Sequence, residues 1–122
     1  GVAAVYLFGS RVEGTARPGS DYDFAFIMRD VRRITPHVEK ELYNQLFDIV
    51  NGAITQRDFQ TIDLVFLQRV PLYYTMNVLK HGELLYDGDF KVRMRFEEHA
   101  RLMYMDFEPY RKELEAATLA MV

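Results

Sequence analysis

The sequence predicts an α/β (α+β) domain in which a small mixed β-sheet is flanked by helices and followed by a long C-terminal helix. Short apolar runs at 3–8, 22–28 and 61–68 are typical of buried strands. Later segments carry apolar residues at helical spacing, which indicates amphipathic helices. The resulting order of strand, strand, helix, strand and helices favours layers packed on one sheet.

Length and composition predict one folded domain spanning residues 1–122. Hydrophobic residues make up 49% and charged residues 27% of the 122-residue chain, which is a globular balance. The chain has no Cys, so it has neither a disulfide framework nor a thiolate metal site. A cytoplasmic location agrees with that composition.

Charge and hydropathy bear on the partners. The net charge of −3 shows no basic surplus, so we expect no direct binding of nucleic acid. No apolar run approaches the length that crosses a bilayer, so we expect no membrane association. The chain opens at Gly1 directly in an apolar run, and we expect that an N-terminal helix is missing before it.

The first two strands frame a polar connection. The run Ala3–Phe8 predicts a buried strand that ends at Gly9. The next residues are rich in Gly, Ser, Thr and Pro, with one turn of helix expected over Ser10–Glu13 and a loop over 14–20. A second strand is predicted over Tyr22–Met28.

The middle of the chain predicts a helix and a third strand. Thr35 precedes Pro36, as an N-cap precedes proline at the first helical position. We expect this helix to stop at Asn51 and Gly52. The run 61–68 is rich in β-branched and aromatic residues, which favours a strand.

Three elements complete the prediction. A helix begins at Pro71 and closes at His81 and Gly82, and a short strand is expected over 83–86. A long helix follows from about Phe90, and Pro109 is expected to kink or break it.

Two aspartates at the start of the second strand are the first candidate functional residues. Asp21 and Asp23 are two residues apart, so a strand projects both carboxylates from one face. Their mutual repulsion is relieved by a hard divalent cation, and oxygen ligands favour Mg²⁺ or Mn²⁺.

A third carboxylate is expected from the third strand. Asp63 lies between Ile62 and Leu64, where an unpaired charge is costly. If the second and third strands are neighbours, Asp63 completes an acidic cluster able to hold two metal ions about 3.5–4 Å apart. Asp58 is the alternative third acid, but its place before the strand favours a turn or a cap.

A phosphate seat is expected just before the aspartates. Gly9 permits close approach of a phosphate to the backbone, and Ser10 offers a hydroxyl and a helical turn. Arg11 and Arg17 are interpreted either as phosphate contacts or as solvated surface residues. A phosphate seat, paired metal ligands and a proton-accepting carboxylate are the parts that nucleotidyl transfer requires.

These motifs resemble those of the DNA polymerase β-like nucleotidyltransferase superfamily. Gly9-Ser10, ten intervening residues and Asp21-Tyr22-Asp23 carry the resemblance. The whole chain is similar to the minimal nucleotidyltransferase (MNT) proteins encoded beside HEPN-domain toxins, through Ile62-Asp63-Leu64-Val65, His81-Gly82-Glu83-Leu84-Leu85-Tyr86 and Tyr104-Met105-Asp106-Phe107.

The resemblance implies a nucleotidyltransferase fold, a reaction and a partner. It implies that Asp21 and Asp23 bind Mg²⁺ and ATP, and that Asp63 binds metal and helps to deprotonate the acceptor. Gly9 and Ser10 would bind the triphosphate. It also implies an antitoxin that transfers AMP to a tyrosine of a HEPN toxin (AMPylation), as a hetero-oligomer with the toxin or as a homo-oligomer.

Two other functions stay open at this point. One is nucleotidyl transfer to a small-molecule hydroxyl, as in aminoglycoside nucleotidyltransferases, although so short a chain leaves little for an acceptor pocket. The other is an antitoxin that acts by occlusion without catalysis. The last helix is rich in Met, Phe and Tyr, which indicates either a wide core face or a docking surface for another chain.

Overall fold

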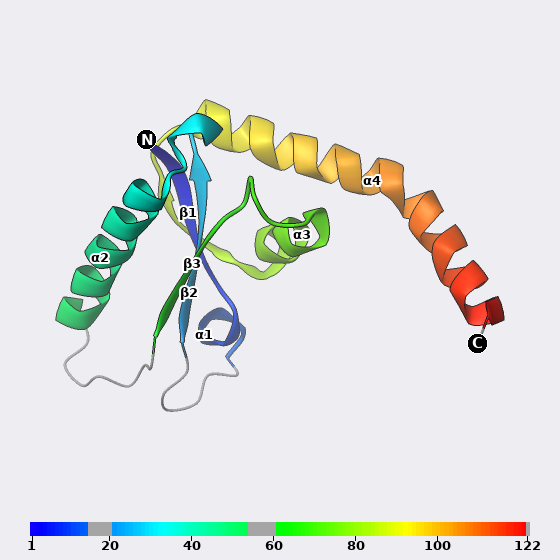
Figure 1. The fold of residues 1–122 in the computed structure, drawn as a ribbon, viewed down its shortest axis with the longest axis horizontal. Helices are drawn as coiled ribbons and strands as arrows, with labels where there is room; N and C mark the ends of the chain where they lie inside the picture. Colours follow the sequence, from blue (N-terminus) through cyan, green and yellow to red (C-terminus); the bar gives the residue numbers. More distant parts are fainter. Residues whose placement is uncertain (15–20, 54–60, 122) are drawn as a thin grey trace.

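The structure is a computed structural model that describes residues 1–14, 21–53 and 61–121 (Figure 1). In chain order, its elements are β1 (Val2–Phe8), α1 (Ser10–Glu13), β2 (Tyr22–Met28), the short 3₁₀ helix η1 (Val31–Arg33), α2 (Pro36–Ala53), β3 (Ile62–Phe66), α3 (Leu72–His81), β4 (Glu83–Asp87) and α4 (Phe90–Met121). None of the helices in these ranges combines the length and apolar character that crossing a membrane would need.

The four strands form one mixed sheet, as the sequence predicted, and their order is β3-β2-β1-β4. β1 is antiparallel to both β2 and β4, whereas β2 and β3 are parallel. Two parallel neighbours cannot be joined by a tight hairpin, so α2 lies in the crossover between them. This arrangement brings the first residues of β2 and β3 to the same end of the sheet (Figure 1).

The sheet is covered on both faces, and β2 contributes to both cores. Phe24, Phe26 and Met28 belong to the cluster that includes Val50 of α2. Ala25 and Ile27 project to the opposite face, into the cluster that includes Val78 of α3. Figure 1 shows α2 on one side of the sheet, and α3 with the first half of α4 on the other. Side chains two residues apart in a strand share a face. Asp23 therefore faces α3, as Ala25 and Ile27 do.

Most predicted elements are confirmed, and several boundaries differ by one or two residues. β3 ends at Phe66, because Gln68 turns back to bond with the backbone of Met28 through both atoms of its side-chain amide. The predicted stop of α2 at Gly52 is wrong, since the helix continues to Ala53. An exposed glycine inside a helix costs only about 1 kcal/mol, which the packing of α2 offsets. The predicted N-cap is confirmed: the Val38 N–H donates to Thr35 Oγ1 over 3.2 Å.

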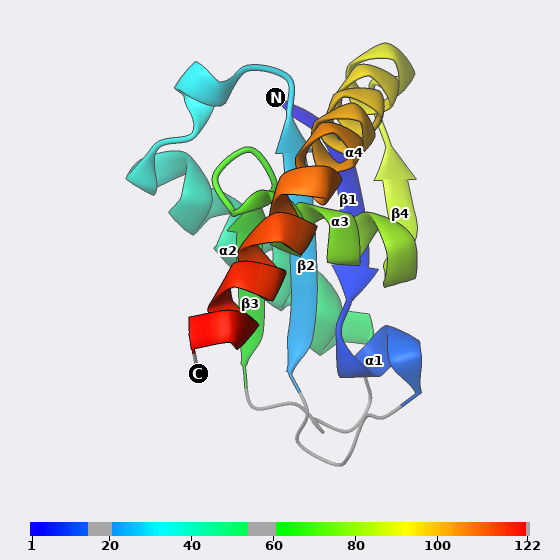
Figure 2. The ribbon, with the colours of Figure 1, turned by 90° about the vertical axis from the view of Figure 1, so that its right-hand side faces the viewer.

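The last helix continues through Pro109 and does not break there. Its second half turns away from the direction of the first half and extends beyond the body of the molecule (Figures 1 and 2). A proline removes one helical hydrogen bond and bends the axis without ending the helix when both sides favour helix. The first half therefore packs on the core through Phe96 and Ala100, and the second half does not.

Several apolar side chains between Met103 and Met121 of α4 are exposed, so they do not form a wide core face. We call the set at successive spacings of four and three residues the distal stripe; it comprises Met103, Phe107, Tyr110, Leu114, Ala117 and Met121. Leu114 is 61% exposed and Met121 85% exposed. Alternating spacings of four and three place these residues on one side of a helix, as in the seam between two packed helices.

A buried polar network ties α4 to the sheet. Tyr6 in β1 donates a hydrogen bond from its hydroxyl to Glu97, which is 7% exposed. Arg93 donates to the same carboxylate over 3.1 Å and lies 3.0 Å from Asp87 at the end of β4. Burial, and then the hydrogen bond to Glu97, raise the pKa of the Tyr6 hydroxyl. The network holds the first half of α4 across β1 and β4.

Replacing Glu97 with Ala is expected to lower the free energy of unfolding by about 3 kcal/mol. The change leaves the buried Tyr6 hydroxyl without its acceptor and takes one carboxylate from Arg93. Chemical denaturation measures the loss. Glu98→Ala, at an exposed neighbouring position, is the control and should change stability by less than about 0.5 kcal/mol. Equal effects of the two substitutions would contradict a structural role for the network.

Candidate active site

Three carboxylates meet at the end of the sheet where β2 and β3 begin. Asp23 lies directly opposite Asp63 in the parallel register of these strands. The two side chains share a hydrogen bond, and the charge of Asp21 also reaches Asp23. The structure therefore brings together the three acids that the sequence analysis singled out.

Asp23 is the carboxyl group most altered by this clustering. Burial, the hydrogen bond with Asp63, and the charges of Asp63 and Asp21 together raise the pKa of Asp23 to about 6. A hydrogen bond between two carboxyl groups requires a proton on one of them. Without a cation, the pair therefore retains a proton up to nearly neutral pH.

Gly9 fits against the same carboxylate. Its backbone has φ 82° and ψ −158°, a conformation that essentially only glycine adopts. A Cβ atom added here would lie 2.4 Å from Oδ2 of Asp23. Phe8, the residue before it, pairs with Asp23 across the β1–β2 ladder. Gly9 is thus the residue type that lets the turn after β1 pass directly over the acid.

The turn after Gly9 begins the short helix α1 at Ser10. The N–H groups of Val12 and Glu13 donate back to the carbonyl of Gly9, each over 3.1 Å. In an α-helix the first N–H groups, here including that of Ser10, have no carbonyl one turn earlier to accept their hydrogen bonds. Ser10 therefore presents both a hydroxyl and a backbone amide next to the glycine, as the predicted phosphate seat requires.

Arg11 lies beside the site but is directed to the other face of the sheet. Its guanidinium carbon lies 4.5 Å from the centre of the Tyr22 ring, and Tyr22 packs with the α2-side cluster. The structure therefore places the Arg11 guanidinium against Tyr22, on the α2 side of the sheet. Arg17 and Asp58, the other residues that the sequence analysis weighed, lie outside the described residues.

Tyr74 of α3 is a further neighbour of the site. Its ring meets Phe8 edge to face, with centroids 5.7 Å apart. Burial, followed by the charges of Asp23 and Asp63, raises the pKa of its hydroxyl. The sequence feature that could have identified Tyr74 is its spacing of four residues from Val78, which places both residues on the inner side of α3. α3 thus forms one wall beside the acids.

The donor set fits a hard cation, although within the described ranges no three such groups stand ready to hold a metal. Asp21 accepts a hydrogen bond from the Thr61 N–H over 3.1 Å through Oδ1, while Asp23 and Asp63 bond to each other. Carboxylate oxygens are the ligands that Mg²⁺ prefers. A cation that displaced the shared proton would relieve the repulsion that raises the pKa of Asp23.

Sequence comparison identifies the family. The sequence profile of the polymerase beta nucleotidyltransferase family matches residues 1–91. This chain belongs to that family. The matched span runs from β1 into α4 and contains all three acids together with Gly9 and Ser10. The fold and the class of enzyme expected from the sequence, a nucleotidyltransferase, are therefore confirmed. No curated protein matches the chain at a significant level.

Solved structures confirm the fold of this nucleotidyltransferase domain. A toxin–antitoxin crystal structure with AMP-PNP aligns with TM-score 0.72 and 22% identity, covering 97% of this chain and 86% of that one. A complex of a tri-AMPylated Shewanella oneidensis HEPN toxin with its MNT antitoxin aligns with TM-score 0.66 and 20% identity, covering 97% and 83%. The MntA–HepT toxin–antitoxin structure aligns with TM-score 0.65 and 20% identity, covering 97% and 84%.

Proposed function

We propose that this nucleotidyltransferase transfers AMP from ATP to a tyrosine hydroxyl of a HEPN toxin, and so acts as its antitoxin. The observation that carries the proposal is the meeting of Asp21, Asp23 and Asp63 beside Gly9. The similar structures support the choice of nucleotide and partner, because they include a complex with AMP-PNP and an AMPylated HEPN toxin.

The reaction is a displacement at the α-phosphorus of ATP. The acceptor oxygen forms a bond to this phosphorus, the bond to the oxygen bridging to the β-phosphate breaks, and pyrophosphate leaves with the electron pair. Mg²⁺, held by Asp21, Asp23 and Asp63, would offset the negative charge of the phosphates. Asp63 is the most exposed of the three acids, so its carboxylate is placed to accept the proton of the incoming hydroxyl. Gly9 and Ser10 would hold the departing phosphates.

The distal stripe favours a protein acceptor over a small molecule. Its apolar residues follow a helix-packing repeat and extend the face with which α4 covers the core. A face that continues this way beyond the body is suited to an α-helix of a partner protein. We propose that a helix of the HEPN toxin covers the distal stripe and brings the acceptor tyrosine within reach of the acids.

The direct experiment combines the protein, a HEPN toxin, Mg²⁺ and ATP, and measures the intact mass of the toxin. A mass increase by whole AMP units is expected, and EDTA should abolish it. An unmodified toxin that is nevertheless neutralised would favour occlusion over catalysis and would overturn the proposed reaction. A parallel incubation with an aminoglycoside tests the small-molecule alternative, and transfer to the drug but not to the toxin would establish it.

Leu114→Asp is expected to weaken binding of the toxin about 30-fold, because it places a charge in the centre of an apolar contact. The dissociation constant measured by calorimetry or biosensor checks this prediction. Leu119→Asp is the matched control: Leu119 is 70% exposed and lies outside the distal stripe. The control should bind within about twofold of the unsubstituted protein. If both substitutions weaken binding equally, the stripe is not the docking surface.

A further inference from the structure

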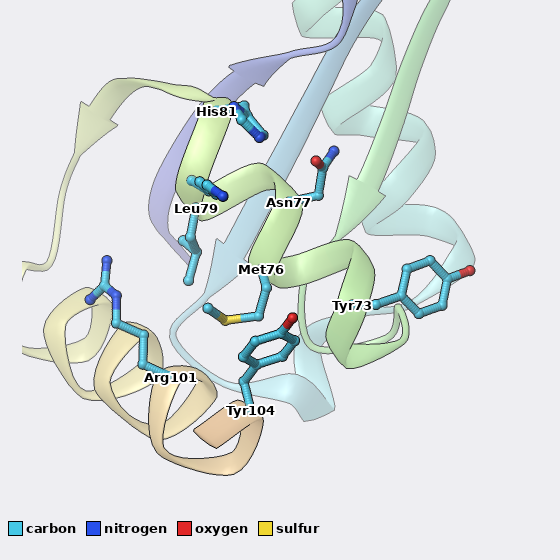
Figure 3. Close-up of a pocket in the computed structure, with 8 residues that line it drawn as sticks. Tyr73, Met76, Asn77, Leu79, His81, Arg101 and Tyr104 are labelled. Atoms are coloured by element: carbon cyan, nitrogen blue, oxygen red, sulfur yellow. The ribbon is translucent and has the colours of Figure 1, made fainter. Parts of the chain in front are cut away.

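A cavity of about 460 Å³ lies between α3 and α4, outside the acidic site (Figure 3). α3 contributes Tyr73, Met76, Lys80 and His81, and α4 contributes Arg101 and Tyr104. In Figure 3 the side chains of Met76 and Tyr104 face each other across the space between the two helices. The volume is within the range of about 300–1,000 Å³ that is common for small-molecule sites.

The chemistry of the lining favours an anion that carries a flat ring. Lys80 and Arg101 supply positive charge, His81 supplies a ring nitrogen, and Tyr73 and Tyr104 supply aromatic faces. The lining residues include no Asp or Glu. Cationic side chains bind phosphate through charge-assisted hydrogen bonds, and tyrosine rings stack on nucleobases.

Arg101 is the residue that sets this cavity apart from an ordinary helix end. Lys80 and His81 occupy the last turn of α3, where cations also offset the helix dipole. Arg101 comes from the other helix and is 52% exposed. Its carboxylate neighbour, Glu97, lies 3.6 Å away and already bonds to Tyr6 and Arg93. The guanidinium is therefore available to a ligand as well as to Glu97.

The cavity and the acidic site border different residues of α3. Tyr74 faces Phe8 and senses the charges of Asp23 and Asp63, whereas the adjacent Tyr73 borders the cavity and is 71% exposed. Asp21, Asp23 and Asp63 are not among the residues that line the cavity.

We propose that the cavity between α3 and α4 binds a nucleoside monophosphate group without a divalent cation. The phosphate is placed beside Arg101 and Lys80, and the base is placed against Tyr104 and Met76. Two molecules carry this nucleoside monophosphate group. One is free AMP; the other, which rests on the proposed function, is an AMP unit already attached to the acceptor protein.

The first test measures binding of AMP to the protein in EDTA by calorimetry. Arg101→Ala is expected to weaken AMP binding at least tenfold, and adenosine should bind at least tenfold more weakly than AMP. Arg95→Ala, at another exposed arginine of α4, is the control and should leave binding unchanged. Asp23→Asn should also leave it unchanged, because the acids lie outside the cavity. AMP binding that is lost in Asp23→Asn but retained in Arg101→Ala would overturn the proposal.

The second test compares AMPylated with unmodified toxin, using toxin modified chemically or by another enzyme if this protein transfers no AMP. Tighter binding of the AMPylated form that disappears in Arg101→Ala identifies the attached unit as the ligand. AMP binding without such a difference identifies free nucleotide as the ligand. If neither AMP nor the AMPylated toxin responds to Arg101→Ala, the proposal is overturned. The first test involves no transfer, so failure of the proposed function would be seen separately.

Discussion

Asp23→Asn and Asp63→Asn are each expected to lower AMP transfer on the order of 10³-fold. Each amide removes a negative oxygen donor from the proposed cation site, and Asp63→Asn also removes the group placed to accept the proton. The measurement is the rate at which the intact mass of the toxin increases under single-turnover conditions with saturating ATP. Asp48→Asn, at an exposed position of α2, is the control and should keep the full rate.

Asp23→Asn should at the same time make the protein more stable at pH 8 in EDTA, by about 1 kcal/mol. The pKa of Asp23 rises from 3.8 to about 6 on folding, so the native state holds its proton more tightly than the unfolded chain. The stability that Asp23 contributes is therefore lost as the pH rises from about 4 to 6. The full shift corresponds to about 3 kcal/mol, and solvent screening around this partly exposed pair reduces it to about 1 kcal/mol.

Denaturation curves at pH 4 and pH 8 check this prediction. The stability of Asp23→Asn relative to the wild-type protein should be higher at pH 8 than at pH 4. A variant that is inactive but also unfolded would show a lower unfolding midpoint instead. Loss of transfer together with a gain in stability therefore separates a functional carboxylate from a structural one. An active Asp23→Asn variant would refute the catalytic assignment.

The acidic cluster was predictable because its geometry depends on short-range rules. The alternation of side chains along a strand places Asp21 and Asp23 on one face, and a charge between Ile62 and Leu64 indicates a partner for Asp63. Whether the acids meet depends on β2 and β3 being neighbours, which the sequence analysis stated only as a condition. The structure meets that condition, with Asp23 opposite Asp63.

Contacts between distant elements were not predictable in the same way. The approach of Gly9 to Asp23 follows from the antiparallel register of β1 and β2. That register depends on how the two strands pair, which the analysis of each strand by itself did not address. The place of Tyr74 depends on how α3 crosses the sheet. The exposure of Leu114 depends on the second half of α4 leaving the body after Pro109, whereas apolar spacing alone suits a buried face equally well.

Gly9→Ala is expected to lower AMP transfer about 100-fold and the free energy of unfolding by about 1–3 kcal/mol. The new methyl group would lie 2.4 Å from Oδ2 of Asp23, so either the carboxylate or the turn must move. A displacement near 1 Å at a group that positions the reacting atoms is enough for a loss of this size. Transfer rates and chemical denaturation measure the two effects.

Gly14→Ala is the matched control, because both glycines have positive φ, 82° at Gly9 and 75° at Gly14. Among the described residues, and apart from its chain neighbours, a Cβ atom at Gly14 would meet no atom within 4 Å. We therefore expect this variant to carry the cost of the left-handed backbone, about 1–2 kcal/mol. Transfer by Gly14→Ala should stay within about twofold of the wild-type rate. If the two alanine variants lose activity equally, backbone strain explains the loss and the contact with Asp23 does not. A selective loss at Gly9 would show that the turn after β1 and the acid at the start of β2 act as one site.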